Sequence, residues 1–405
     1  MRTPLILLVV VILAGAAVGG WVAANQLMEG DGGGGTATPT PTPTRIGTLT
    51  PTPTVGPPLE GARLVYKEFG SEADVFWLAA AADPQRRVQF AQAEHAAGSG
   101  IRASLSPDGK LVAYTLLPVG ATDGPTQAEV WVAGLEGGEG RRRLTQGVDL
   151  ASTPVWSPDG TSIVVRRNGP GREIGRAASL VALDVSDASE TVVLAEEDVL
   201  ELFPVGYSPA GVLYVARITI AGTDFGMILP DGSVSYPVHA SDQTARDWHL
   251  SSGGSRIAFL AGQRTDGRIA LRAFVTELVA GALPKPLSDF ASALDVGDHF
   301  NPIWHPDGEL IAVGRTPTDG VSPVTLVSPA GGPPASVTPG PERGFDVPAG
   351  FSPDGDYLAV RWFEGKSALE PGREHLMLIK VGGGRAEVGD KGNLEFIGWL
   401  PSGAQ

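Results

Sequence analysis

The sequence predicts an all-β protein: a seven-bladed β-propeller that follows a hydrophobic N-terminal segment and a Thr/Pro-rich linker. Three observations support this prediction. A Ser-Pro-Asp-Gly-like turn recurs along most of the chain, and short apolar segments flank each copy. The glycine and proline contents are also high, with 55 Gly and 34 Pro among 405 residues. Many short strands joined by tight turns, repeating every 40 to 50 residues or so, are typical of propeller blades.

Residues 1–27 are predicted to be a membrane anchor or signal segment. Leu5–Ala24 contains no charged residue and is long enough to cross a bilayer as a helix, with Trp21 near its outer end. Arg2 is the only nearby charged side chain, so the positive-inside rule places the N-terminus in the cytoplasm and the remainder outside. The alternative is a cleaved signal peptide, because Val22–Ala24 resembles a small-residue cleavage site. In both cases we expect the rest of the chain to be exported.

Residues 28–59 are predicted to form an extended linker. Glu29–Gly35 is mostly glycine, and Thr36–Pro58 is dominated by alternating threonine and proline. Proline removes backbone donors, and the segment has almost nothing apolar to bury. We therefore expect a semi-extended stalk that rises about 3 Å per residue.

Residues 60–405 are predicted to be the propeller. Each repeating unit has an apolar or aromatic residue, a Ser-Pro-Asp-Gly-like turn and an apolar strand. The seven turns end in glycines that are 43 to 54 residues apart: Gly109, Gly160, Gly211, Gly254, Gly308, Gly355 and Gly403. Serine first, proline second and glycine fourth fit a type I turn. We therefore interpret the aspartates of the motif as turn residues and not as catalytic carboxylates.

Aromatic side chains precede five of the turns and are predicted to fill the gaps between neighbouring blades. They are Trp156, Tyr207, Trp304, Phe351 and Trp399. After each turn come an apolar strand, a third strand that ends in a glycine turn, and a fourth strand. Four strands per unit make a blade.

The two ends of the repeat region are predicted to share the last blade. The turn at Gly403 lies too close to the C-terminus to precede a second strand, whereas Ala62–Tyr66 has the pattern of that strand without a turn before it. We predict an inner strand at Leu394–Trp399 and the other three strands within residues 62–92. This closure removes free sheet edges and gives seven blades; the alternative is six, if the terminal fragments are irregular.

The Ser-Pro-Asp-Gly turn, its flanking strands and the Gly-Gly…Leu-Thr end of the unit resemble TolB-like propellers with WD-like Pro-Asp repeats. The resemblance covers about residues 60–405 and implies the fold. It does not imply one function, because such propellers serve as scaffolds, receptors and enzyme gating domains. Three blades depart from the motif, with Ala210, Ser252-Gly253 and Ser402 in place of its Pro-Asp chemistry.

Composition and motifs exclude several function classes. The formal net charge of −15 repels phosphate backbones, so we expect no nucleic-acid partner. The absence of cysteine removes disulfides, thiolate catalysis and cysteine metal sites. The sequence has no Gly-x-Ser-x-Gly elbow, P-loop, dinucleotide fingerprint or His-Glu-x-x-His motif. We therefore expect no cofactor and no metal.

Two sets of side chains are candidates for ligand contacts. Asp298-His299 with His305 is the closest histidine cluster, interpreted as turn or capping hydrogen bonds, with a metal site as the alternative. Three arginines follow the second strand of their blades, and we expect them to pair with loop carboxylates; the alternative is a ring of positive charge for an anionic ligand. These are Arg167, Arg217 and Arg315.

Long loops between second and third strands supply the main site prediction. Pro118–Ala128, Asn168–Ala178 and Glu364–Glu374 belong to blades that form one arc with the closing blade. They share a face with the connections between blades, including Ser288–Asn301 and Pro339–Ala349. Because binding residues concentrate on loops of rigid scaffolds, we predict a recognition surface there; ordinary loop-length variation is the alternative. The candidate contact residues are Arg172, Arg176, Lys366, Arg373, Asp298 and His299.

We expect a membrane-tethered, extracytoplasmic and non-catalytic module that binds a protein or a cell-envelope polymer. The alternative is a hydrolase or lyase in the propeller channel, which needs convergent carboxylates or a cation. Inner strands that are apolar or small favour binding, at Pro154, Val155, Pro204, Pro302 and Ile303. An intracellular adaptor would require that residues 1–24 are not a targeting segment. The ligand and the oligomeric state are left open.

Overall fold

A computed structural model of the chain describes residues 61–401 except for short gaps at 122–123, 136–139, 169–175, 266–267, 291–293, 295–296, 319 and 390–391. The predicted anchor and linker and the end of the seventh turn lie outside these residues. Within the described part, no helix combines the length and the apolar character needed to cross a membrane.

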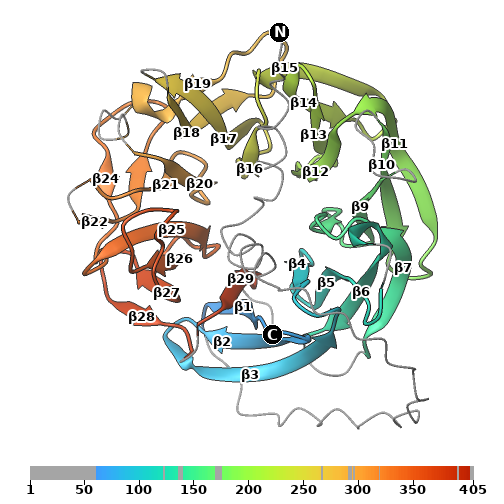
Figure 1. The fold of residues 1–405 in the computed structure, drawn as a ribbon, viewed down its shortest axis with the longest axis horizontal. Helices are drawn as coiled ribbons and strands as arrows, with labels where there is room; N and C mark the ends of the chain where they lie inside the picture. The colour runs from blue at the N-terminus through green and yellow to red at the C-terminus, as the bar shows by residue number, and fades with distance from the viewer. Residues whose placement is uncertain are drawn as a thin grey trace, which may run out of the picture.

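Seven antiparallel sheets surround a central channel, and each contains four strands of one blade (Figure 1). This confirms the predicted all-β, seven-bladed architecture. Blade 1 comprises β4 (Ile101–Leu105), β5 (Leu111–Leu116), β6 (Ala128–Gly134) and β7 (Arg142–Val148). Blade 2 comprises β8 (Val155–Trp156), β9 (Ser162–Asn168), β10 (Arg176–Asp184) and β11 (Glu190–Val199). Blade 3 comprises β12 (Glu201–Tyr207), β13 (Leu213–Thr219), β14 (Gly222–Ile228) and β15 (Val234–Ser241).

The outer strands become very short in the next three blades. Blade 4 comprises β16 (Arg246–Leu250), β17 (Arg256–Thr265), β18 (Arg268–Glu277) and β19 (Lys285–Pro286). Blade 5 comprises β20 (His299–Trp304), β21 (Ile311–Arg315), β23 (Thr325–Val327) and β24 (Ala335–Ser336). Blade 6 comprises β25 (Gly344–Phe351), β26 (Tyr357–Phe363), β27 (Glu374–Lys380) and β28 (Arg385–Glu387). A fifth strand, β22 (Val321–Ser322), pairs in parallel with the start of β25.

Blade 7 contains both ends of the propeller, as predicted. Its strand order is β29 (Leu394–Trp399), β1 (Arg63–Glu68), β2 (Ala73–Ala80) and β3 (Asp83–Glu94). The inner strand therefore comes from the C-terminal end, and its partner β1 is the first described strand of the chain. Tyr66 pairs with Phe396, with a bulge beside this pair. The ring is closed by hydrogen bonds between segments more than 300 residues apart.

The Ser-Pro-Asp-Gly segments form the predicted turns between first and second strands. In blade 1 the Gly109 amide donates to the Ser106 carbonyl at 2.9 Å. The Asp108 carboxylate accepts from the Ser106 hydroxyl at 2.7 Å and from the Lys110 amide at 3.1 Å, and the bond from Ser106 is the main cause of its lowered pKa. Gly109 has φ +71, and a Cβ there would lie 2.5 Å from Pro401 of blade 7. The aspartate is therefore a turn residue, and glycine is required because neighbouring turns pack together.

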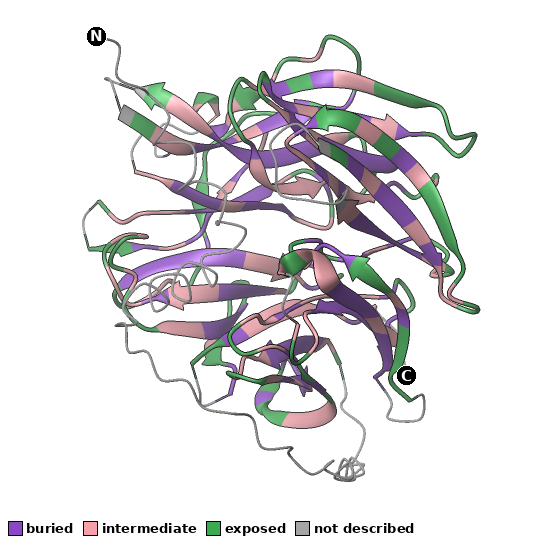
Figure 2. Cartoon of the chain, turned by 45° about the vertical axis from the view of Figure 1, so that its right-hand side comes forward, coloured by how far each residue is buried: buried purple, intermediate pink, exposed green. Residues whose placement is uncertain are grey.

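The aromatic residues before the turns lie between blades, as predicted. The indole nitrogens of three tryptophans each donate to a carbonyl on the inner strand of the preceding blade. The pairs are Trp156 with Ser104 at 3.3 Å, Trp304 with His249 at 3.0 Å and Trp399 with Gly350 at 3.0 Å. Figure 2 shows that buried residues run along the strands, whereas exposed residues gather at strand ends and loops.

The propeller has two distinct faces. We call the face with the Ser-Pro-Asp-Gly-like turns and the third-to-fourth strand connections the turn face. The opposite face carries the second-to-third strand loops and the connections between blades, and we call it the loop face. The Ala81 amide donates to the Ala62 carbonyl at 2.8 Å, beside the third-to-fourth turn of blade 7. The described chain therefore starts on the turn face.

Candidate functional site

The loop face carries the predicted long loops of blades 1 and 6, and that of blade 2 lies largely in the undescribed range 169–175. In blade 1 the loop ends in a 3-10 turn, η1 (Pro125–Gln127). The inner strand of blade 7 packs against β25 of blade 6 on one side and against β4 of blade 1 on the other. Blades 6, 7, 1 and 2 therefore form the continuous arc that the sequence predicted.

The blade 6 loop presents Lys366 and Arg373 to solvent on a narrow hairpin. The Glu364 amide donates to the Arg373 carbonyl at 3.0 Å, and the Lys366 amide donates to the Glu370 carbonyl at 3.0 Å. Glu364 anchors the base of the hairpin through ion pairs with Arg343 at 2.6 Å and His375 at 3.2 Å. Both cationic side chains are exposed, and neither forms an ion pair with another described residue. They are available to an external partner.

Asp298 and His299 lie where the connection from blade 4 meets the first strand of blade 5, and backbone groups bind both side chains. The Asp298 carboxylate accepts from the Leu271 amide at 3.0 Å. His299 is fully buried; its Nδ1 accepts from the Ala273 amide at 3.0 Å, and its Nε2 donates to the Leu294 carbonyl at 2.8 Å. Burial lowers the pKa of His299 to about 4, so the ring is neutral. These two side chains cover the edge of β18, where the two-residue β19 leaves amides without a strand partner.

The six predicted contact residues do not form one cluster in the described part of the structure. Arg172 lies in an undescribed range, and Arg176 begins β10 of blade 2, opposite Val199. Lys366 and Arg373 belong to blade 6, whereas Asp298 ends the connection between blades 4 and 5 and His299 begins β20 of blade 5. Their role in ligand binding stays a prediction, with Lys366 and Arg373 in the most accessible positions.

Two of the three arginines that follow second strands form the predicted ion pairs with carboxylates, and for Arg315 the pairing stays a prediction. Arg167 forms an ion pair with Glu190 at 2.9 Å. Arg217 forms one with Asp224 at 2.9 Å and stacks over Tyr236. These ion pairs join strands within one blade or between neighbouring blades, which is the expected structural role.

The channel mouth on the loop face is more charged than the apolar inner-strand positions suggested. Asp247 lies at a bulge of the inner strand β16, with φ +49. Arg361 of blade 6 bonds Glu374 at 2.5 Å and also interacts electrostatically with Asp247 and with Glu395 of blade 7. Asp247 and Arg361 therefore interact electrostatically although their blades, 4 and 6, are not neighbours in the ring. Burial raises the pKa of Asp247, and Arg246 only partly opposes this effect.

A hydrogen-bonded chain also connects three inner strands around the channel. His249 Nε2 donates to Asn301 Oδ1 at 2.9 Å, and Asn301 Nδ2 donates to the Pro348 carbonyl at 2.6 Å. Burial lowers the pKa of His249, so the imidazole is neutral. The chain joins blades 4, 5 and 6 and fixes the side of the ring that carries Asp247.

Blade 7 contains an ion-pair chain with one side chain from each strand or its end. Lys67 Nζ lies 2.9 Å from both Glu395 and Asp74, and Asp74 lies 3.0 Å from His95 Nε2. Lys67, Asp74 and His95 are buried, whereas Glu395 is partly exposed. His95 Nδ1 faces the Ala96 carbonyl at 2.9 Å, so both ring nitrogens face acceptors and the geometry fits the imidazolium. The charges alternate in sign and connect β29, β1, β2 and the end of β3.

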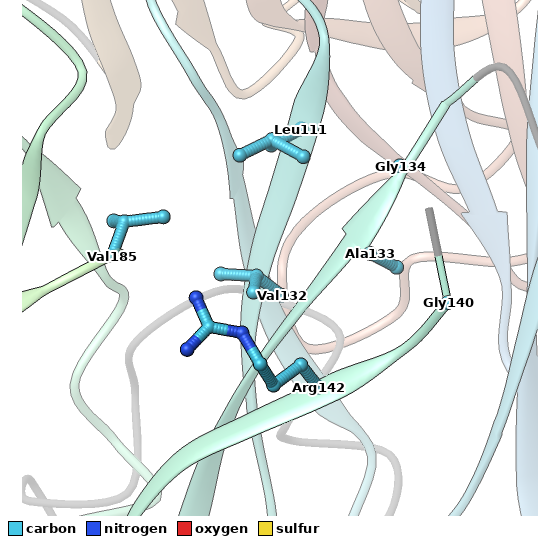
Figure 3. A pocket seen from close by; sticks show the side chains of 7 residues that line it. All are labelled: Leu111, Val132, Ala133, Gly134, Gly140, Arg142 and Val185. Atoms are coloured by element: carbon cyan, nitrogen blue, oxygen red, sulfur yellow. The ribbon is translucent and has the colours of Figure 1, made fainter. Parts of the chain in front are cut away.

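A shallow depression of about 340 Å³ lies on the turn face between blades 1 and 2 (Figure 3). Its lining is mainly aliphatic, from Leu111, Val132 and Val185, with the Arg142 guanidinium at its rim. It is remote from the predicted loops. In the described residues no group of three or more histidine and carboxylate side chains is arranged to hold a metal ion.

The sequence reasoning missed the charged channel residues. A signal was present, because four carboxylates occupy the first half of inner strands a few residues before their turns. They are Glu201, Asp247, Asp346 and Glu395. Two of them are neutralised by arginines of the same or the adjacent blade: Glu201 by Arg166, and Asp346 by Arg385 at 2.7 Å. Most of these carboxylates are therefore paired with a cation. Asp247 is the one of the four with the weakest pairing to a nearby cation.

No protein-family model matches the chain, and no curated protein matches it in sequence. Among solved structures, an acylaminoacyl peptidase in complex with Z-Gly-Gly-Phe-chloromethyl ketone is similar over 81% of this chain and 50% of that chain, with 13% identity and a TM-score of 0.53. TolB from Acinetobacter baumannii is similar over 66% of this chain and 61% of that chain, with 16% identity and a TM-score of 0.46. The β-propeller domain of the Trilobed protease from Pyrococcus furiosus is similar over 82% of this chain and 97% of that chain, with 14% identity and a TM-score of 0.48.

The chain spans less than two thirds of the first two of these proteins, 50% of the peptidase and 61% of the TolB. At such low identity the likeness concerns the fold alone. The seven four-stranded blades make the chain a β-propeller, which is the fold that its predicted resemblance to TolB-like propellers implied.

Proposed function

We propose that this protein is a membrane-tethered, extracytoplasmic β-propeller that binds a protein or a cell-envelope polymer through its loop face without catalysing a reaction. The tether would be the apolar segment Leu5–Ala24, and residues 28–59 would be the stalk. The rigid ring would carry the loops of blades 1, 2 and 6 as one recognition surface.

The observation that carries this proposal is the position of the chain entry relative to the loops. The described chain enters on the turn face beside Ala81, whereas Lys366 and Arg373 lie on the opposite face. A stalk attached to the turn face leaves the loop face unobstructed and directed away from the attachment point. The loop face also carries exposed cations, which suit an acidic protein surface or an anionic polymer.

The pairing of the channel charges supports a binding role. Arg361 is bonded to Glu374, and Glu201 and Asp346 are paired with arginines, which leaves few groups poised for acid–base chemistry. Such networks hold blades together and fix the loops that they carry.

The test is crosslinking in cells followed by mass spectrometry, with charge-reversal variants. We expect Lys366→Glu with Arg373→Glu to lose specific crosslinked partners that the unaltered chain captures. Lys110→Glu is the matched control, because Lys110 is an exposed lysine on the turn face. Partners that persist in the double variant, or disappear equally in the control, would contradict a recognition role for the loop face. Carbonate extraction of the same cells tests the tether separately.

One observation favours the alternative, a hydrolase or lyase in the channel. Asp247 and His249 are two residues apart on β16, and burial raises the pKa of the Asp247 carboxyl and lowers that of the His249 imidazole, so the two values approach each other. If this reading is correct, a panel of ester, glycoside and uronic-acid substrates will include one that the protein turns over and the Asp247→Asn variant does not. Turnover that is unchanged in Asp247→Asn would assign any activity to another source.

A further inference from the structure

An exposed apolar area occupies the turn face at blades 3 and 4. Leu229 and Val234 flank the third-to-fourth turn of blade 3 and are 38% and 41% exposed. Val279 and Leu283 lie in the corresponding connection of blade 4 and are 53% and 79% exposed. We call these four residues, together with Ala210 in the first turn of blade 3, the apolar sector.

The apolar sector coincides with two of the three blades whose turns lack the motif aspartate; the third is blade 7, which has Ser402 at that position. Blades 3 and 4 have Ala210 and Gly253 at that position. The other described turns have a carboxylate there: Asp108, Asp159, Asp307 and Asp354. Each of these carboxylates accepts local backbone hydrogen bonds, so losing it also costs turn stability. Two neighbouring blades have therefore lost charge on the same face that displays exposed aliphatic side chains.

Contacts join the parts of the apolar sector into one surface. A Cβ on Gly211 would lie 3.8 Å from the Pro230 ring, which brings the first turn of blade 3 next to its third-to-fourth turn. A Cβ on Gly254 would lie 2.6 Å from Ser208, so the first turns of blades 3 and 4 touch. Leu278 and Ala282 of blade 4 pack into the same cluster as Met227 of blade 3. The sector is continuous across the boundary between the blades.

We propose that the apolar sector is the interface through which two copies of this chain associate. The sector has charges of opposite sign on its two blades, Asp231 at the tip of the blade 3 turn and Lys285 in β19 of blade 4. A two-fold axis through the boundary between the blades sets Asp231 of one copy against Lys285 of the other, while the aliphatic side chains meet at the centre. The sector is thus complementary to itself in charge and in polarity.

The location and size of the apolar sector fit this occupant. The described chain starts in blade 7, on the other side of the ring from blades 3 and 4, so its first described residues lie away from the contact (Figure 1). The four side chains expose a few hundred Å², the size at which an apolar patch on a monomer becomes informative. Stable interfaces bury about 600 Å² or more per partner, so the flanking Pro209 and Pro230 must take part and the dimer is weak. A bilayer fits less well, because Asp231 projects from the tip of the turn and a carboxylate is poorly tolerated there.

The experiment is sedimentation equilibrium of the full chain in a density-matched detergent over a wide concentration range. We expect a monomer–dimer equilibrium with a micromolar dissociation constant. Val279→Glu with Leu283→Glu should weaken it at least tenfold. Val381→Glu, an exposed aliphatic on the turn face of blade 6, and Val119→Glu, on the loop face, should leave it unchanged. A monomer at every concentration, or a dimer that the sector variant does not weaken, overturns the proposal.

Charge exchange tests the two-fold geometry in the same assay. Asp231→Lys or Lys285→Asp alone should weaken the dimer, and the two together should restore it. Failure of the double variant to recover overturns the isologous arrangement. The chain has no cysteine, so a single Leu283→Cys label reports its own surroundings cleanly. The label is then tested in vesicles of phosphatidylcholine and phosphatidylglycerol that contain brominated lipid. If the chain stays monomeric and the lipid quenches the label, the sector binds a lipid surface and the dimer proposal is overturned.

Discussion

Replacing Asp74 by asparagine tests whether the ion-pair chain of blade 7 holds the closing blade together. Asp74 is fully buried and accepts three bonds, from Lys67 at 2.9 Å, His95 at 3.0 Å and the Gly70 amide at 3.2 Å. Asparagine keeps the size of the side chain but removes the charge, which leaves Lys67 and His95 buried with less compensation. Breaking a buried pair in this way costs about 3–5 kcal/mol.

The loss is large compared with the stability of a folded domain, which is about 5–15 kcal/mol. At roughly 2–4 °C per kcal/mol, the melting temperature of Asp74→Asn should fall by about 6–20 °C. The assay is urea unfolding followed by tryptophan fluorescence, with thermal unfolding in parallel. A loss below about 1 kcal/mol would refute the reasoning, because such a value is typical of exposed pairs.

The same ion-pair chain predicts how stability depends on pH. Burial opposes the charged imidazole, but the bond to Asp74 outweighs it and raises the pKa of His95 above 6.5. The stabilisation from His95 is therefore fully present below pH 6.5 and is lost as the pH rises through the folded pKa. Burial also opposes the Asp74 carboxylate, but bonds from His95 and Lys67 lower its pKa below 3.8, so its contribution is lost only as the pH falls through that lower value. We expect His95→Gln to remove part of the stability difference between pH 6 and pH 9; an unchanged difference would contradict this role of His95.

Three further variants test separate parts of the structure. Trp304→Phe should cost about 1–3 kcal/mol, because it leaves the His249 carbonyl without its indole donor; an unchanged urea midpoint would contradict a role for this bond between blades. Asp298→Ala should cost about 1–3 kcal/mol and increase hydrogen exchange at the Leu271 amide, whereas an unaltered exchange rate would show that another group covers the β18 edge. Asp247→Asn should stabilise the protein at pH 7, because burial raises the pKa of Asp247 and the charged form is penalised in the folded state; the gain should vanish below about pH 4, and a loss at pH 7 would reverse this interpretation.

The sequence predicted the features that depend on local chemistry and repetition. The Ser-Pro-Asp-Gly turn needs only four residues to define it, so its positions located the blades. The closing of blade 7 followed from a missing strand at one end and an extra strand at the other, and the inner strand Leu394–Trp399 matches the prediction at both ends. These features could be inferred because their causes lie within one repeating unit.

Other features could not be inferred, because they depend on which blades meet across the channel. Nothing in the sequence around Arg361 indicates that its guanidinium interacts electrostatically with both Asp247 and Glu395. The roles of Asp298 and His299 were likewise hidden, because they follow from the short β19 of the neighbouring blade. The apolar sector could not be found from the sequence, because only the strand order shows that Leu229 and Leu283 lie on the same face.

The arrangement of blade 7 has a consequence for how the protein is made. β1 ends at Glu68 and its partner β29 begins at Leu394, so the 325 residues between them must be synthesised before the two strands can pair. At about 5–20 residues per second this takes roughly 15–65 s. During that interval β1 has one open edge that can pair with other chains, and the cost of closing so long a loop slows the final step. The β1 edge stays open until the last strand emerges, so a factor that covers this edge until then would raise the yield of closed rings.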